Sequence, residues 1–242
     1  MADKIFEDQR LVNIYDCFDG QRDDLQHYLA IANELNANSI LDIGCGTGCF
    51  ASLLGKNGFE VIGLEPAEAS LNMAKTKPYT ENVKWILGDT TDLPSIKVDL
   101  AVMTGNVAQV FLEDKSWEQT LKSIHKALYT NGHLVFEVRD PSKKAWLDWT
   151  KDKTEKKLEV PNIGVVNSWC EVTSVSDEFV SFRWNYFFEA DGEAITSDST
   201  LRFREKEDII QSLEKSGYAI KEIRDAPDRP GKEFVFIAET KS

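Results

Sequence analysis

Three glycines at alternate positions follow a short apolar stretch near residue 40. Residues 40–43 indicate a buried strand, Gly44, Gly46 and Gly48 come next, and apolar residues then recur at helical spacing over 50–54. Glycine allows positive φ in a tight turn and lets a ligand lie against bare backbone. The following helix turns its free N–H groups and positive dipole end toward that turn. The spacing therefore predicts a site for an anionic or hydroxyl-rich ligand; the alternative is a generic strand-to-helix turn.

Two acidic residues lie at or near the ends of two expected strands, one before the glycine turn and one after the helix that follows it. Asp42 lies inside the first strand, and Glu65 ends the strand 59–65, 17 residues after Gly48. A buried carboxylate is costly unless it is hydrogen-bonded or faces a charged ligand, so Asp42 is expected to serve the site. A carboxylate at the second strand tip can accept both hydroxyls of a ribose. The alternative for Glu65 is a surface charge at a strand end.

Residues 41–48, Leu-Asp-Ile-Gly-Cys-Gly-Thr-Gly, carry a resemblance to a known family. They resemble, at every position, the first motif of the class I S-adenosylmethionine (AdoMet) methyltransferases, and Glu65 matches the ribose-binding acid of that family. The resemblance covers 39–140 strongly and 201–240 more loosely. It implies AdoMet as the cofactor and methyl transfer by in-line displacement at the sulfonium. The cofactor residues expected around the turn are Asp42, Gly44, Cys45, Gly46, Gly48, Glu65 and Pro66.

The third expected strand, 83–87, is followed by an acidic loop. An acid just after a strand tip can accept a hydrogen bond from an exocyclic amine. In the resembling family this acid binds the adenine amino group, and the backbone of the next residue binds a ring nitrogen. Asp89 and Thr90 are the candidates for those roles, with Asp92 as the second choice for the acid. The alternative for Asp89 is an Asx-type turn.

The fourth expected strand, 98–103, leads to the segment that should flank the transferable methyl, because ligands lie outside the carboxyl ends of the strands in an open α/β sheet. Met103 and Asn106 are the candidates there. Family members that methylate amines on nucleic acid or protein can carry an Asn/Asp-Pro-Pro-aromatic motif at this place. This chain does not, which argues against chemistry on an exocyclic base amine.

Contacts with the methyl acceptor are expected from three parts of the chain. The segment 1–38 resembles the leading segment that caps the cofactor in similar methyltransferases, and Tyr15 is its candidate for a cofactor contact. Arg139, at the exit of the fifth strand, is a candidate anchor for a substrate carboxylate. Aromatic residues alternate over 182–188, where they either line a substrate wall or pack the sheet. The acceptor candidates are Arg22, Gln109, Arg139, Trp169, Trp184 and Tyr186, and no catalytic residue is assigned.

The pattern of strands and helices predicts an α/β protein. The resemblance implies a Rossmann-like, doubly wound, seven-stranded sheet whose last strand is antiparallel. Three β-rich runs, 164–175, 179–189 and 195–204, predict an inserted antiparallel β-sheet over 160–204. The resemblance implies that this insert forms a substrate wall. The AdoMet-binding domain would then comprise 39–159 and 205–242, with 1–38 as a cap segment and helix. The lysine-rich stretch 143–157 indicates a solvated helix or a mobile lid, the sharper alternative being a nucleic-acid patch.

The charge and cysteine content of the chain limit the kinds of partner and metal site that we expect. The chain has 242 residues and a net charge of −13, which argues against nucleic acid as a partner, although a local basic patch can oppose the total charge. The acceptor expected from the resemblance is a small molecule. The four cysteines have neither Cys-x-x-Cys spacing nor a histidine at metal spacing, so no metal site is expected. No signal peptide and no apolar run of membrane-spanning length is present, and a cytoplasmic protein is expected. Oligomeric state leaves no signal in the sequence.

Two other function classes share some of these features. An NAD-type oxidoreductase also carries a glycine turn and an acid at a strand tip, but Cys49 occupies the position of its third glycine. The acid after the third strand also counts against it. A catalytically silent AdoMet-binding module is the other alternative, because no residue in the sequence requires a reactive centre.

Overall fold

The computed structural model describes residues 2–241, which form a large mixed sheet and a smaller antiparallel sheet. The larger sheet has seven strands in the order β10-β11-β5-β4-β1-β2-β3. Strands β1 to β5 run parallel, and β11 runs antiparallel to both β5 and β10. The predicted fold class is therefore confirmed. The bounds are β1 (Ser39–Ile43), β2 (Glu60–Glu65), β3 (Lys84–Leu87), β4 (Val98–Met103), β5 (Leu128–Arg139), β10 (Tyr218–Asp225) and β11 (Glu233–Thr240).

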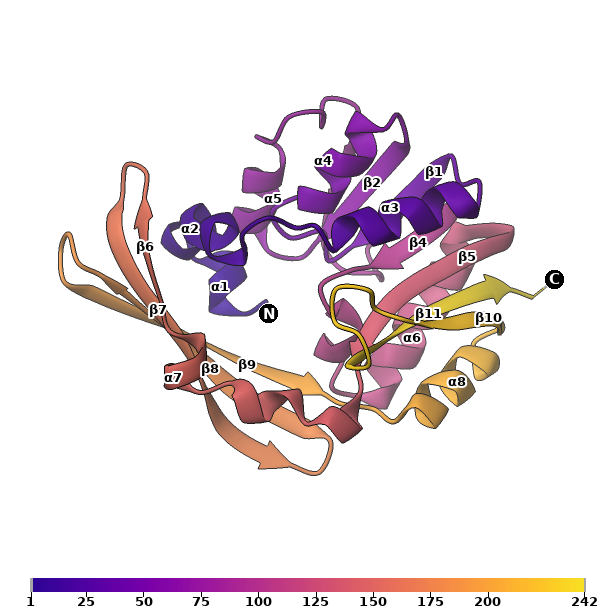
Figure 1. Ribbon diagram of the computed structural model, residues 1–242. Helices are drawn as coiled ribbons and strands as arrows, with labels where there is room; N and C mark the ends of the chain where they lie inside the picture. Colours follow the sequence, from indigo (N-terminus) through magenta and orange to yellow (C-terminus); the bar gives the residue numbers. More distant parts are fainter. Residues whose placement is uncertain (1, 242) are drawn as a thin grey trace.

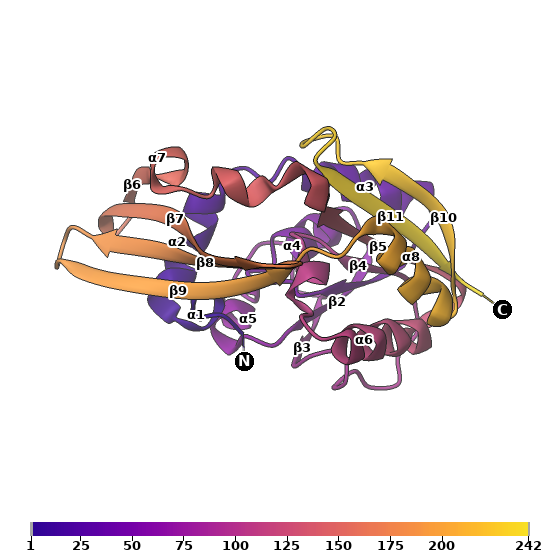
Figure 2. The same cartoon turned by 90° about the horizontal axis from the view of Figure 1, so that it is seen from below.

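Helices cover both faces of this sheet (Figure 1). The apolar sides of α3 and α4 pack on one face, and those of α6 and α8 pack on the other. Figure 2 shows α6 and α8 lying together on the side opposite α3. The helix bounds are α1 (Lys4–Glu7), α2 (Gln9–Asp19), α3 (Leu25–Glu34), α4 (Cys49–Lys56), α5 (Glu68–Ala74), α6 (Asp114–Ala127), α7 (Lys151–Thr154) and α8 (Lys206–Lys215). Short 3-10 turns are η1 (Val107–Val110), η2 (Pro141–Lys143) and η3 (Ala145–Asp148).

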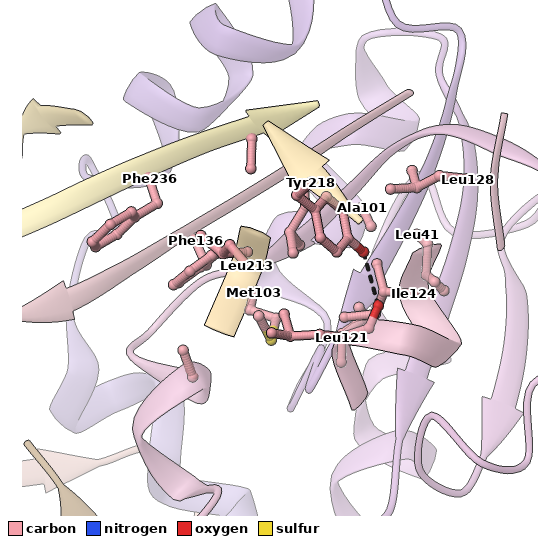
Figure 3. Close-up of a cluster of buried hydrophobic side chains, with 14 of the residues drawn as sticks. Leu41, Ala101, Met103, Leu121, Ile124, Leu128, Phe136, Leu213, Tyr218 and Phe236 are labelled. Atoms are coloured by element: carbon pink, nitrogen blue, oxygen red, sulfur yellow. Dashed lines mark hydrogen bonds between the residues drawn. The ribbon is translucent and has the colours of Figure 1, made fainter. Parts of the chain in front are cut away.

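Buried side chains under α6 and α8 connect strands β5, β10 and β11 with helix α6 (Figure 3). Phe136 of β5 and Phe236 of β11 stack with ring centroids 5.2 Å apart. The buried hydroxyl of Tyr218 donates a 2.9 Å hydrogen bond to the carbonyl of Leu121, so β10 is fixed to α6. Burying each such large side chain stabilises the fold by roughly 1.5–3 kcal/mol.

The smaller sheet is the predicted insert, with one strand more than expected. Its order is β6-β7-β8-β9, and its bounds are β6 (Lys156–Val160), β7 (Gly164–Ser176), β8 (Phe179–Phe188) and β9 (Glu193–Arg202). The sheet begins at Lys156, four residues before the boundary expected at 160. The stretch 143–157, expected as one helix or lid, consists of short helical turns and the start of β6. Exposed Lys156 and Lys157 fit an edge strand, where charges discourage further pairing.

The inner face of the smaller sheet is covered at two places and open between them. Val166, Tyr186, Phe188 and Ile195 pack against α1 and α2. At the other end Trp146 and Trp149 pack against Val180, Phe182 and Phe203. Figure 1 shows α1 and α2 standing between this sheet and the helices beside β2. No helix within residues 2–241 has the length and hydropathy needed to cross a membrane.

Candidate functional site

A cavity of about 1230 Å³ lies between the carboxyl ends of the parallel strands, helices α1 and α2, and the smaller sheet. Strand order reverses between β1 and β4, and crevices in open α/β sheets form at such a switch point. A site for one drug-sized ligand has a volume of roughly 300–1,000 Å³. The cavity therefore has room for two ligands side by side.

The glycine turn forms one edge of this cavity, and its glycines serve different purposes. Gly44, Gly46 and Gly48 all have positive φ, between 53° and 80°. A Cβ on Gly44 would lie 2.7 Å from Val107, and one on Gly48 would lie 2.7 Å from Ala74, so these two glycines allow close packing. A Cβ on Gly46 would meet nothing within 4 Å. Of the three, Gly44 and Gly46 line the cavity, whereas Gly48 and the buried Cys45 do not.

Glu65 is held rigidly at the same edge. Its side chain is buried, and its carboxylate accepts hydrogen bonds from the backbone N–H groups of Gly46 (2.9 Å) and Ala67 (3.0 Å). Burial raises the pKa of the Glu65 carboxyl, although the two backbone hydrogen bonds oppose this shift. A carboxylate offers about four lone-pair sites, so both oxygens keep acceptor capacity. Glu65 and the following Pro66 line the cavity.

Asp42 lies behind this edge. Its side chain is 1% exposed, neither carboxylate oxygen has a hydrogen-bond partner within residues 2–241, and it does not line the cavity. Burial, together with the nearby Glu65, raises the pKa of Asp42 to about 7. Asp42 therefore lies next to the cavity edge formed by the glycine turn and Glu65, but its side chain does not reach the cavity.

The acidic loop after β3 presents Asp89 and Thr90 to the cavity. Asp89 Oδ1 accepts hydrogen bonds from the backbone N–H and the hydroxyl of Thr91, at 2.7 and 2.6 Å. The Asx-type turn thus occurs, and it orients the carboxylate while leaving Oδ2 without such a bond. Asp92 turns its carboxylate to the backbone N–H of Asp89 (2.9 Å) and does not line the cavity. Of the two acids, Asp89 has the position that the adenine role requires.

The segment after β4 contributes Asn106 but not Met103. Met103 is fully buried in the core under α6. Asn106 lines the cavity in a left-handed conformation, with φ at 63°. Its backbone N–H donates to Glu137 Oε1 (2.6 Å), and its side-chain amide lies 3.3 Å from Glu233 Oε1. Two buried carboxylates therefore hold Asn106 in place.

The N-terminal helices close one side of the cavity. Tyr15 of α2 lines it, with its ring 5.6 Å from that of Phe6, and burial raises the pKa of the Tyr15 phenol. Arg22 does not line the cavity. It forms ion pairs with Asp19 and Asp24, each at 2.8 Å.

The acceptor candidates on the smaller sheet lie on different faces. Trp184 and Tyr186 lie on the inner face and line the cavity, with ring centroids 6.3 Å apart. Trp169 pairs with Asn185 of β8, whose side chain points away from that face. Its indole N–H donates to Glu171 (3.1 Å), and Lys151 lies 4.2 Å above its ring. The structure therefore does not bring Trp169 to the cavity.

Arg139 and Gln109 form a pair at the end of β5. Arg139 lines the cavity, and its side chain is 22% exposed. Gln109 is buried and does not line the cavity. Its Oε1 accepts hydrogen bonds from Nη1 (3.2 Å) and the backbone N–H (3.3 Å) of Arg139. Gln109 thus orients Arg139.

Three residues near the site were not predicted from the sequence. Glu137 lies in β5, Glu233 in β11 and Asp16 in α2, and no motif marks these positions. Their roles depend on tertiary contacts with Asn106, Arg139 and Thr47. A charged residue inside an otherwise apolar strand, such as Glu137 in β5, was the one available hint.

Comparisons with known proteins place this geometry in context. Residues 40–132 match the family model described as a methyltransferase domain. An uncharacterised methyltransferase of Oceanobacillus iheyensis is 32% identical over 46% of this chain and 53% of the relative. The cypemycin N-terminal methyltransferase of a Streptomyces species is 25% identical over 59% of this chain and 60% of that protein. The chain thus spans about half the length of the first curated relatives it matches.

Solved structures match over nearly the whole chain at low identity. The CcbJ methyltransferase from Streptomyces caelestis aligns with a TM-score of 0.77, 17% identity and coverage of 98% of this chain and 97% of that chain. An amino pentose methyltransferase from Micromonospora echinaspora, solved with AdoMet bound, aligns with a TM-score of 0.71 and 19% identity, covering 93% and 94%. These likenesses establish the shared fold, including the second sheet.

Proposed function

We propose that this chain is a class I AdoMet-dependent methyltransferase that transfers a methyl group to a small molecule, as the match of residues 40–132 to a methyltransferase-domain model supports. The observation that carries the proposal is the edge formed by Gly46 and Glu65. There a buried, rigidly held carboxylate faces a cavity beside a turn that has no side chain at its open position.

The residues at this edge fit the cofactor. Glu65 would accept the ribose hydroxyls, and Asp89 would accept the adenine amino group next to the backbone of Thr90. Gly44 and Gly46 would leave room for the amino acid part, and Tyr15 would cover it from α2. AdoMet supplies an activated methyl group on a sulfonium, whose leaving group needs no protein acid.

The contribution of the protein is then alignment and exclusion of water. A well-oriented intramolecular reaction gains roughly 7–11 kcal/mol over the bimolecular one. The wall opposite the cofactor edge would come from the inner face of the smaller sheet, through Trp184 and Tyr186. Asn106, fixed by two carboxylates, would stand beside the reacting atoms. The contacts with the cofactor and those with the acceptor would thus come from different parts of the chain. This supports our proposal that segment 1–38 caps the cofactor and that the inserted sheet forms one wall of the acceptor site.

Calorimetric titration with S-adenosylhomocysteine, with NADH in parallel, tests the cofactor assignment. Micromolar binding of the first alone is expected and would justify screening small amines, carboxylates and phenols for methyl uptake. Binding of NADH alone would point to an oxidoreductase. If neither bound, a silent module would replace the enzyme.

Glu65→Ala tests the ribose role within the same titration. Affinity for S-adenosylhomocysteine should fall at least several-fold, because hydrogen bonds to a charged acceptor contribute roughly 1.5–3 kcal/mol. The exposed Glu60, at the other end of β2, offers the control substitution Glu60→Ala. Unchanged affinity in Glu65→Ala would exclude the ribose assignment.

A further inference from the structure

We propose that the methyl acceptor carries an anionic group, a carboxylate or a phosphate, which pairs with Arg139 in the cavity. This inference rests on the proposed function and names the class of acceptor. It starts from the position of Arg139 as the last residue of β5, beside β4 and β11. The carboxyl ends of β4 and β5 face the ligand crevice, the amino end of the antiparallel β11 lies beside them, and Arg139 lines the cavity.

The guanidinium of Arg139 is only partly neutralised by the protein. Its ion pair with Glu233 spans 3.8 Å, which is beyond hydrogen-bond distance. Glu233 Oε1 instead accepts a 2.6 Å hydrogen bond from Nη1 of Arg229. The buried carboxylate of Glu233 therefore pairs with two guanidinium groups, those of Arg139 and Arg229. Burial lowers the pKa of Arg139, and the nearby carboxylates of Glu233 and Glu137 oppose this shift without cancelling it.

Gln109 and Trp149 fix the direction of this cation. The amide oxygen of Gln109 accepts from Nη1 of Arg139 (3.2 Å), and the Trp149 ring lies 5.5 Å from the guanidinium carbon. A planar, fixed guanidinium presents a fork of N–H groups that matches a carboxylate or phosphate. Gln109 and Glu233 act here as positioning residues.

The charges around the cavity differ between its two sides. The cofactor edge carries the carboxylates of Glu65 and Asp89, and the segment of α1 and α2 adds Asp3, Glu7 and Asp19 to the lining. On the smaller sheet, Arg183 lines the cavity but is engaged by Asp198 through two hydrogen bonds of 2.7 and 3.0 Å. Lys156 donates to the carbonyl of Phe18 (2.9 Å). In a chain of net charge −13, Arg139 is thus a local cation on the acceptor side, suited to one anionic group.

The test uses two matched pairs of small aromatic probes and the full chain saturated with S-adenosylhomocysteine. Benzoate is compared with benzamide, and phenyl phosphate with phenol, by calorimetry or ligand-observed NMR. We expect at least one anion to bind about ten-fold tighter than its neutral partner. The arm that shows the larger preference identifies carboxylate or phosphate as the group recognised.

Variants assign the preference to its residue. Arg139→Gln should abolish it, Arg139→Lys should retain part of it, and Arg183→Gln should leave it intact. The proposal is overturned if neither anion binds better than its neutral partner, if the preference survives in Arg139→Gln, or if it is lost in Arg183→Gln alone. Binding of S-adenosylhomocysteine, measured first in each variant, reports separately on the proposed function.

Discussion

The hydroxyl of Thr47 donates a 2.6 Å hydrogen bond to Oδ1 of Asp16, so the glycine turn is fastened directly to helix α2. The other carboxylate oxygen of Asp16 pairs with Lys77 Nζ at 2.5 Å, and Lys77 follows α5. One side chain of α2 thereby joins two elements of the main domain. Because Tyr15 is its neighbour on the same helix, this contact sets how α2 covers the cavity.

Asp16→Ala should loosen this cover. Charge-assisted contacts that are partly exposed contribute roughly 1–2 kcal/mol, so affinity for S-adenosylhomocysteine should fall about five-fold or more. Amide exchange within α1 and α2 should accelerate while β1 and β4 stay protected. Asp23→Ala, in the turn after α2, is the control and should change neither quantity. Equal exchange in both variants would show that α2 is held by packing alone.

Gly44 and Gly46 should respond differently to the same substitution. Gly44→Ala adds a Cβ 2.7 Å from Val107 and should lower the melting temperature clearly. Gly46→Ala meets no atom within 4 Å, so its stability cost is limited to the left-handed backbone, about 1–2 kcal/mol. Its Cβ should instead obstruct the cofactor edge and weaken S-adenosylhomocysteine binding. Thermal scans and calorimetry on both variants compare these effects; the reverse ranking would contradict the geometry.

The main sheet was predictable because its signals are local. Buried strands such as Leu41–Ile43 are apolar runs, and the glycine turn marks where the first one ends. The insert sheet followed from alternation over 182–188, but β6 was missed because Lys156–Val160 is a mostly exposed edge strand with two adjacent lysines. Alternation also could not show which face of the sheet would meet the cavity, so Trp169 was grouped with Trp184.

The candidate site was less predictable where it depends on residues distant in sequence. Asn106 is fixed by Glu137 of β5 and by Glu233 of β11, which lie 31 and 127 positions away. No local pattern encodes such contacts. Met103 was grouped with Asn106 because both follow β4, but its side chain lies in the core under α6. Sequence identified the strand ends, and tertiary structure determined which side chains reach the cavity.

Glu137 should make the stability of the protein fall as pH rises. Burial raises its pKa from 4.5 to about 7 in the folded state. Between these values the unfolded chain releases the proton while the folded chain keeps it, so the free energy of unfolding decreases with pH and levels off above about 7. The loss is at most about 3 kcal/mol, at 1.36 kcal/mol per unit.

Glu137→Gln should remove part of this slope, because glutamine keeps an acceptor for the Asn106 N–H and cannot ionise. Buried Asp42, whose pKa is also raised to about 7, should sustain the remainder. Urea unfolding between pH 5 and 8 measures the slope, and Glu60→Gln, at an exposed position, is the control. A slope identical to that of the wild type would mean that Glu137 ionises freely in the folded protein.

Trp184 and Trp169 are matched probes for the role of the smaller sheet. Trp184 lines the cavity, whereas Trp169 lies on the opposite face, with its indole bonded to Glu171. Trp184→Ala should raise the KM of any acceptor found by screening about five-fold, because aromatic contacts contribute roughly 1 kcal/mol beyond their area burial. Its kcat should change less, since the cofactor edge lies across the cavity. Trp169→Ala should leave both constants near their wild-type values. If the two variants behave alike, the sheet supports the cap without contacting the acceptor, and acceptor binding must then depend on β4, β5 and α2.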